Sequence, residues 1–214
     1  MNFDFNEEQT MIMDGIARYI REEYDFDRRR SIIESDSAYS DDVWRQFSEL
    51  GWLSIPFDES YGGFGGHADD LAGVMLELGK GLIIEPYMST VVVFGSLLNA
   101  SNNDSLKEQL IPRIINGQYK GSFAYAEEQS RFEISDVKTS AQKCGDGYKL
   151  NGTKIAVIDA KESDGLIVTA RTGGSQYGAE GISLFLVDTS AEGVAVSSYN
   201  TCLLYTSPSP RDGS

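Results

Sequence analysis

Two adjacent carboxylates follow a short alternation of aromatic residues in the second half of the chain. Glu127 and Glu128 come shortly after Phe123 and Tyr125. Paired carboxylates can act as general acid and base, but that chemistry needs further groups placed around the substrate. The sequence offers no second partner for them, so the residues alone favour charges exposed to solvent at the end of a strand. By pattern alone, Phe123 and Tyr125 are typical of a half-buried strand.

Other reactive residue types are scarce. The chain has one histidine, His67, and two cysteines, Cys144 and Cys202. A serine triad, a His-rich metal site and a disulfide framework are therefore excluded within this chain. The glycine-rich segment 62–66 does not match the dinucleotide-binding fingerprint, and no strand is predicted before it. It predicts a turn between two helical segments.

The charge balance excludes further classes of protein. The 18 basic and 33 acidic residues give a net charge of −15. A nucleic-acid reader needs a basic stripe, and the one basic cluster, Arg28–Arg30, is flanked by acidic residues. No apolar run is long enough to span a bilayer, and the N-terminus lacks the pattern of a signal peptide. We therefore expect a cytoplasmic protein.

The first half of the chain has the patterns of helices. Asn6 and Gln9 predict a helix start with reciprocal capping, because each side chain can bond the other residue's backbone. Ser40 is the predicted N-cap of a second helix, and Gly51 its C-terminal stop. Three more helices are predicted over residues 71–78, 87–98 and 104–116. Pro112 is expected to kink or restart the last of them.

From residue 117 the pattern changes to short runs rich in β-branched and aromatic residues. Asn151-Gly152 is a two-residue hairpin signal, because both turn positions need a positive φ. Helices followed by strands predict an α+β chain, with an all-helical domain over residues 1–118 and a small antiparallel β domain over 119–201. The predicted strands cover residues 123–126, 137–142, 148–150, 153–158, 166–171 and 182–187.

Several motifs, taken in order and spacing, resemble one known family. They are an opening FNEEQ at residues 5–9, an ELGWLSIP…YGGFGG segment at 49–66, and DGYKLNGTK at 146–154. Over residues 3–201 the chain resembles the acyl-CoA dehydrogenases. Within them it is most similar to the pimeloyl-CoA dehydrogenase small-subunit-like members, on residues 82–87 and 123–132.

The resemblance implies a FAD site on two segments. Ala126 stands where the family has a threonine whose hydroxyl meets the flavin. Ala156 and Ile158 replace the tryptophan and threonine of the family's W-x-T. Because these hydroxyls are missing, we expect backbone amides to hold the flavin ring. The cofactor-binding residues implied in this way are Phe123, Tyr125, Ala126, Glu127, Ala156 and Ile158.

The resemblance also implies two substrate-binding residues. Phe132 takes the place of a serine near the thioester. Arg131 can pair with a CoA phosphate or a carboxylated acyl tail, although the residue alone slightly favours a plain surface role.

The activity implied is oxidation of an acyl-CoA thioester to the 2-enoyl-CoA, with electrons passing to an electron-transferring flavoprotein. No catalytic residue is expected in this chain, because the family's glutamate base lies in a C-terminal helical domain. The chain alone is therefore expected to be inactive, and the full-length form to be a homo- or hetero-oligomer. Two other interpretations stay open: a non-catalytic partner subunit, or another flavoenzyme on this fold, such as an acyl-CoA oxidase or a monooxygenase.

The last residues break the pattern of everything before them. Residues 202–212, CLLYTSPSPRD, resemble the translation of a transposase-type sequencing adapter. We therefore expect 202–214 to be an artefactual tail without regular structure, and the C-terminal helical bundle to be missing.

Overall fold

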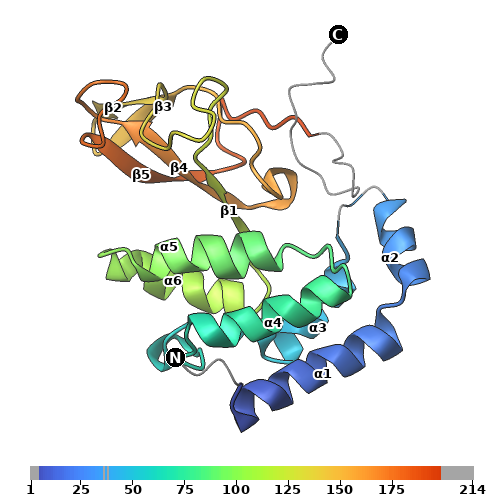
Figure 1. Ribbon diagram of the computed structural model, residues 1–214. Coiled ribbons are helices and arrows are strands. Elements are labelled where there is room, and N and C mark those ends of the chain that lie inside the picture. Colours follow the sequence, from blue (N-terminus) through green and yellow to red (C-terminus); the bar gives the residue numbers. More distant parts are fainter. Residues whose placement is uncertain (1–4, 36, 38, 199–214) are drawn as a thin grey trace. The chain divides into compact units, whose positions relative to one another are not determined.

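The computed structural model describes residues 5–35, 37 and 39–198. The chain divides into two compact units between Tyr119 and Lys120. We call them the helical unit and the sheet unit, and we propose that they are the two predicted domains. The fold class is confirmed, because a helical region is followed by a small sheet (Figure 1). The predicted tail from Cys202 onward lies outside the described residues.

The helical unit contains six α-helices and a π-helix among its described residues. α1 and α4 pack along one another (Figure 1). None of the described helices is long and apolar enough to cross a membrane. The α-helices are α1 (Glu7–Glu23), α2 (Phe26–Ile33), α3 (Asp41–Glu49), α4 (Ala68–Lys80), α5 (Gly95–Asn99) and α6 (Asp104–Ile115). The π-helix, η3, covers Met88–Phe94.

The predicted helix ends are confirmed where short polar side chains bond the backbone. At α1 the Asn6 side chain accepts from the Gln9 N–H at 2.8 Å, and the Gln9 side chain accepts from the Asn6 N–H at 2.9 Å. At α3 the Ser40 hydroxyl accepts from Val43. Gly51 follows α3 with a φ of 77°, a conformation that suits glycine because it has no Cβ.

Two helical predictions differ in detail from the structure. The helix predicted over 87–98 is a π-helix, η3, that passes directly into α5. α6 continues through Pro112 as one element instead of restarting there. Both differences concern hydrogen-bond pattern, which hydrophobic spacing does not encode.

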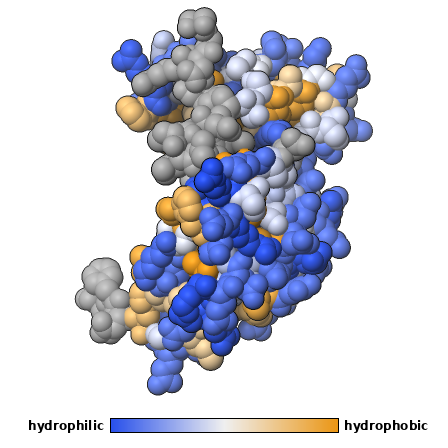
Figure 2. Space-filling model, turned by 90° about the vertical axis from the view of Figure 1, so that its right-hand side faces the viewer, coloured by the Kyte–Doolittle hydropathy of each residue, from blue (hydrophilic) through white to orange (hydrophobic). Residues whose placement is uncertain are grey.

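The core of the helical unit is apolar and aromatic. Tyr19 and Trp52 meet edge to face, with ring centroids 5.4 Å apart, and Phe47 lies against both. The surface is mostly polar on the face shown in Figure 2, as the net charge predicts. Side chains with no exposure include Ile16, Val43, Phe47, Leu53, Val91, Phe94, Ile111 and Ile114.

The sheet unit is built around one buried strand, β4 (Gly165–Arg171). β5 (Ile182–Asp188) pairs with it along its whole length, antiparallel. On its other side lie β1 (Gly121–Ala124) and β2 (Ser140–Cys144), both parallel to it, and β3 (Gly147–Asn151) pairs antiparallel with β2. The sheet is thus mixed, not purely antiparallel as predicted. The connection from β1 to β4 is long enough for a parallel crossover.

The Asn151-Gly152 hairpin prediction is wrong. The β2–β3 turn is Gly145-Asp146, with a positive φ at Gly145 only. Gly at the first of two turn positions is the pattern of a type II′ hairpin, which also suits the strand twist. Gly152 instead lies against Thr139, where an added Cβ would be 2.7 Å from the Thr139 Cα.

The strand predicted over 153–158 is also absent. Those residues form an irregular segment instead. Its hydrogen bonds do not form a strand ladder. The Lys154 ammonium donates to the Tyr125 carbonyl, and the Ile155 N–H donates to the Ala126 carbonyl. Ala156 has a φ of 53°, which no β-strand contains. The β-branched residues of segment 153–158 therefore do not indicate strand pairing.

Candidate functional site

The structure places the two predicted cofactor segments side by side in the sheet unit. The Ile155 N–H donates to the Ala126 carbonyl at 2.9 Å, which ties segment 154–158 to the end of β1. Beside this contact the rings of Phe123 and Tyr125 are stacked, with centroids 5.2 Å apart and planes 23° apart. We call the surface made by Phe123, Tyr125, Ala126, Ala156 and Ile158 the apolar face.

The apolar face is open to solvent. Tyr125 is 46% exposed and Ile158 41%. Within residues 39–198, the backbone N–H groups of Ala126, Ala156 and Ile158 donate to no protein acceptor. Ala156 is held in the left-handed region, a strained conformation for a residue with a Cβ. The two segments therefore combine exposed apolar side chains with three backbone N–H donors that have no acceptor among the described residues.

The interpretation of Glu127 as a solvated strand-end charge is wrong. Its side chain is 3% exposed and forms an ion pair with Lys154, 2.8 Å between Oε1 and Nζ. Burial alone raises the pKa of this carboxyl, but hydrogen bonds from Lys154, Thr139 and Gln129 outweigh it and lower the pKa to about 2. Glu128 is exposed, as predicted.

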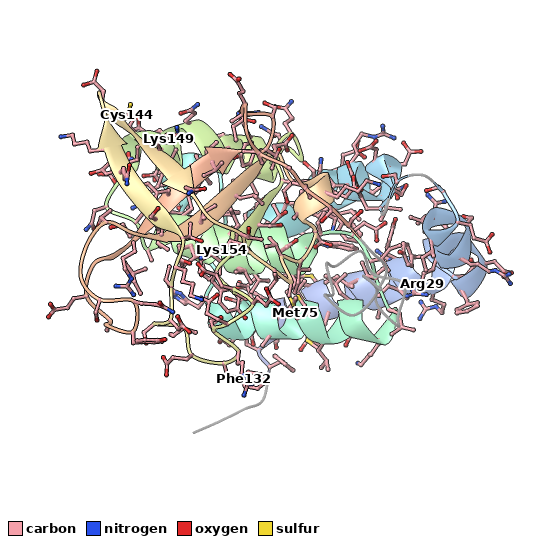
Figure 3. The ribbon with its side chains drawn as sticks, turned by 90° about the horizontal axis from the view of Figure 1, so that it is seen from above. Arg29, Met75, Phe132, Cys144, Lys149 and Lys154 are labelled. Atoms are coloured by element: carbon pink, nitrogen blue, oxygen red, sulfur yellow. The ribbon has the colours of Figure 1, made fainter. Side chains whose placement is uncertain are left out.

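Lys154 is a buried residue beside the candidate site that sequence reasoning missed. Its ammonium donates to Glu127 Oε1 and to Thr169 Oγ1, both at 2.8 Å, and to the Tyr125 carbonyl at 3.3 Å. Its side chain is 8% exposed, and it lies among the strands in Figure 3. The available signal was that Lys154 stands immediately before an apolar segment, 155–158, which favours burial of the lysine. A buried lysine requires an anionic partner, so an ion pair could have been expected.

The predicted substrate residues lie on the loop after Glu127. Phe132 is completely exposed and stands out from the unit in Figure 3. Arg131 is exposed and makes no ion pair with the described part of the chain. It has a φ of 49°, in the left-handed region that favours glycine. The loop thus presents a cation and an aromatic ring to solvent.

A cavity of about 370 Å³ opens on the other side of β1. Its wall includes Ala124, Val157 and Val168. Successive side chains of a strand point to opposite faces, so Phe123 and Tyr125 point away from it. No predicted cofactor or substrate residue lines the cavity. The predicted site residues therefore lie outside this cavity, although Lys154 and Thr139 line it.

Replacing Gly152 with alanine is expected to destabilise the sheet unit by about 1–3 kcal/mol, the usual cost of overpacking. The new Cβ would overlap the Thr139 hydroxyl, which donates to Glu127. Urea unfolding followed through amide signals of β4 measures the effect. Gly147→Ala is the matched control, because a Cβ there meets nothing within 4 Å. Equal stabilities for the two variants would contradict the prediction.

Comparison with protein families gives two matches that together span nearly the whole chain. The acyl-CoA dehydrogenase N-terminal domain matches residues 6–118, and the acyl-CoA dehydrogenase middle domain matches residues 122–204. A curated relative, "Probable acyl-CoA dehydrogenase YngJ" from Bacillus subtilis, is 28% identical over 92% of this chain and 52% of its own length. The chain spans about half the length of the curated relatives it matches.

Solved structures share the fold at low sequence identity. The ChsE4–ChsE5 complex from Mycobacterium tuberculosis matches with a TM-score of 0.85 and 24% identity, over 96% of this chain and 54% of that one. The FAD complex of PigA matches with a TM-score of 0.84 and 24% identity, over 97% and 55%. At these identities the likeness shows the fold alone.

Proposed function

This chain belongs to the acyl-CoA dehydrogenase family, and on that premise we propose that it carries the flavin-binding face of an enzyme that oxidises an acyl-CoA thioester to the 2-enoyl-CoA. The observation that carries the proposal is the apolar face, whose two linked segments contain a stacked aromatic pair and three backbone N–H groups that have no acceptor among the described residues. This face lies in the segment that matches the family's middle domain.

The residues present fit FAD, whose ring system has two apolar faces and a polar edge that carries several hydrogen-bond acceptors and one N–H donor. The N–H groups of Ala126, Ala156 and Ile158 would hold that edge, while Phe123 and Tyr125 cover apolar area beside it. Bound FAD supplies the acceptor for the hydride that leaves the acyl β-carbon. No residue of this chain is proposed as the base, which we place in a further domain of a longer protein.

Arg131 and Phe132 are proposed to meet the substrate. The exposed guanidinium suits a CoA phosphate or a carboxylate on the acyl chain, because charge-assisted pairs with Arg are strong and directional. Phe132 would cover the acyl group near the thioester. An electron-transferring flavoprotein is the proposed acceptor.

The test is made on a protein of the relatives' full length that carries this chain. We expect it to purify with bound FAD and to lose the absorption of oxidised flavin when an acyl-CoA is added without oxygen. Retained flavin that no acyl-CoA reduces would contradict the proposed reaction. Rapid oxygen consumption without another acceptor would instead assign an oxidase or monooxygenase.

A second candidate is a partner subunit that does no chemistry itself. The specific observation is that alanine and isoleucine replace the hydroxyl-bearing residues at Ala126 and Ile158, and a structural neighbour is a two-component complex. In that case, changes on the apolar face would leave turnover of the assembled enzyme unaltered.

Restoring the family's threonine, Ala126→Thr, is expected to raise FAD affinity in the full-length protein by up to about tenfold. One added hydrogen bond contributes roughly 0.5–1.5 kcal/mol. Ala126→Val is the matched control, because valine has the shape of threonine without its hydroxyl. FAD titration of both variants measures the effect. Equal affinities would mean that Ala126 lies against another part of the cofactor.

A further inference from the structure

All the lone-pair directions of the Glu127 carboxylate are engaged inside the protein. Oε1 accepts from the Thr139 hydroxyl at 2.6 Å and from its backbone N–H at 3.0 Å, in addition to Lys154. Oε2 accepts from the Lys138 N–H and from Gln129 Nε2, both at 2.8 Å. Such a carboxylate has no lone pair left for a cofactor or a substrate.

These donors sit at the two ends of one loop. Gln129 lies at its start, and Lys138 and Thr139 lie at its end. The main chain of Glu127 adds to the start, since its N–H donates to Ser130 Oγ and its carbonyl accepts from the Ser130 hydroxyl and N–H. Glu127 therefore closes the loop 128–137, on which Arg131 and Phe132 are exposed.

The same ion pair reaches the apolar face. Lys154 is bonded to the Tyr125 carbonyl, and its neighbour Ile155 to the Ala126 carbonyl. The backbone of both cofactor segments is thereby fixed to the Glu127 carboxylate. A buried ion pair is costly to desolvate, so a well-bonded one is a weak source of stability, but it specifies a single geometry.

We propose that Glu127 is a positioning residue. It holds the loop 128–137, which carries Arg131 and Phe132, and through Lys154 the apolar face in one fixed arrangement. The inference rests on the proposed function for the identity of the ligand. It replaces the implied role of Glu127 as a direct cofactor contact. Thr139 and Gln129 act with it by donating to its two oxygens.

The test compares Glu127→Gln with wild type in the 214-residue chain by hydrogen–deuterium exchange. The amide NH2 of glutamine would face donors where the carboxylate accepts, so bonds at the loop ends are lost. Because Lys154 is left buried without its anionic partner, exchange in β4 and β5 also rises, but we expect exchange in 128–139 to rise about ten- to a hundredfold more than in those strands. Glu162→Gln is the matched control, since Glu162 is a mostly buried glutamate of the same unit outside this network.

A uniform rise across the sheet unit, or unchanged exchange in the loop, would overturn the proposal. If Glu127→Gln does not fold, Thr139→Val removes one hydroxyl donor and keeps the shape. It is then expected to give a smaller rise in the same loop, and no rise there would overturn the proposal.

A second readout separates this inference from the proposed function. FAD is titrated against both proteins while the amide signals of Ala126, Ala156 and Ile158 are followed. We expect the dissociation constant to rise about tenfold or more in Glu127→Gln. If the wild-type protein gives no FAD-dependent amide shifts, the proposed function is contradicted. A rise in hydrogen exchange concentrated in the loop 128–139 would still support the positioning role of Glu127. Equal FAD affinity in the two proteins would overturn the link to the flavin-binding face.

Discussion

Replacing Lys154 with methionine is expected to destabilise the sheet unit by about 3–5 kcal/mol, the usual cost of removing one partner of a buried ion pair. Methionine preserves most of the side-chain volume, so the loss comes from charge and not from a cavity. Glu127 would keep its burial and lose its cationic partner, and Thr169 and Tyr125 would each lose a donor. Urea unfolding, followed through amide signals of β4, measures the change.

Two further variants sharpen that result. Lys149→Met removes an exposed lysine on β3 and is expected to change stability by less than about 0.5 kcal/mol. The double variant Lys154→Met with Glu127→Gln is expected to recover part of the loss, because no uncompensated charge remains buried. A Lys154→Met loss no larger than that of Lys149→Met would contradict the importance of the pair.

The helical unit is expected to lose stability as pH rises from about 4.5 to 7 because of Glu85. Burial raises the pKa of this carboxyl from 4.5 to about 7, against the opposing effect of hydrogen bonds from its surroundings. Its Oε2 has no hydrogen-bond partner within the described residues. A raised pKa means that the folded state binds the proton more tightly. The stabilisation that the protonated Glu85 carboxyl gives the folded state is therefore complete below pH 4.5 and lost by pH 7. The free energy of unfolding falls by about 3 kcal/mol across this range.

The measurement compares wild type with Glu85→Gln from pH 4 to 8. Both tryptophans, Trp44 and Trp52, are buried in the helical unit, so their fluorescence reports its unfolding. We expect the stability of wild type relative to Glu85→Gln to fall across the window and then level off. Glu77→Gln, at a buried but lysine-paired glutamate, serves as control. A constant difference between wild type and Glu85→Gln would refute the prediction.

The helical unit could be predicted well because its signals are local. The capping pair of Asn6 and Gln9, the Ser40 cap and the Gly51 stop each act within one turn of chain. The sheet unit was predicted less well. Composition predicted the approximate positions of its strands, but it also predicted a strand over 153–158 that is absent. The parallel pairing of β1 with β4 joins segments some forty residues apart, which local patterns do not encode.

For the candidate site, too, local sequence signals did not predict contacts between distant segments. Phe123, Tyr125, Ala126, Ala156 and Ile158 could be proposed only from the resemblance. The structure links their two segments through the hydrogen bond from the Ile155 N–H to the Ala126 carbonyl. The burial of Glu127 could not be read from its sequence neighbours, because its partners Thr139 and Lys154 come from distant segments. The Asn151-Gly152 signal failed because close approach to Thr139, and not turn geometry, requires that glycine.

The proposal that the apolar face binds flavin is tested most directly by titrating FAD into the 214-residue chain and mapping backbone amide shifts by NMR. We predict weak, saturable binding, because the resemblance implies that further parts of the site lie outside this chain. The largest shifts should fall on Ala126, Ala156 and Ile158, whose N–H groups have no acceptor in the described protein. Shifts confined to the cavity around Leu150 and Val187, or no shifts at millimolar FAD, would contradict the account.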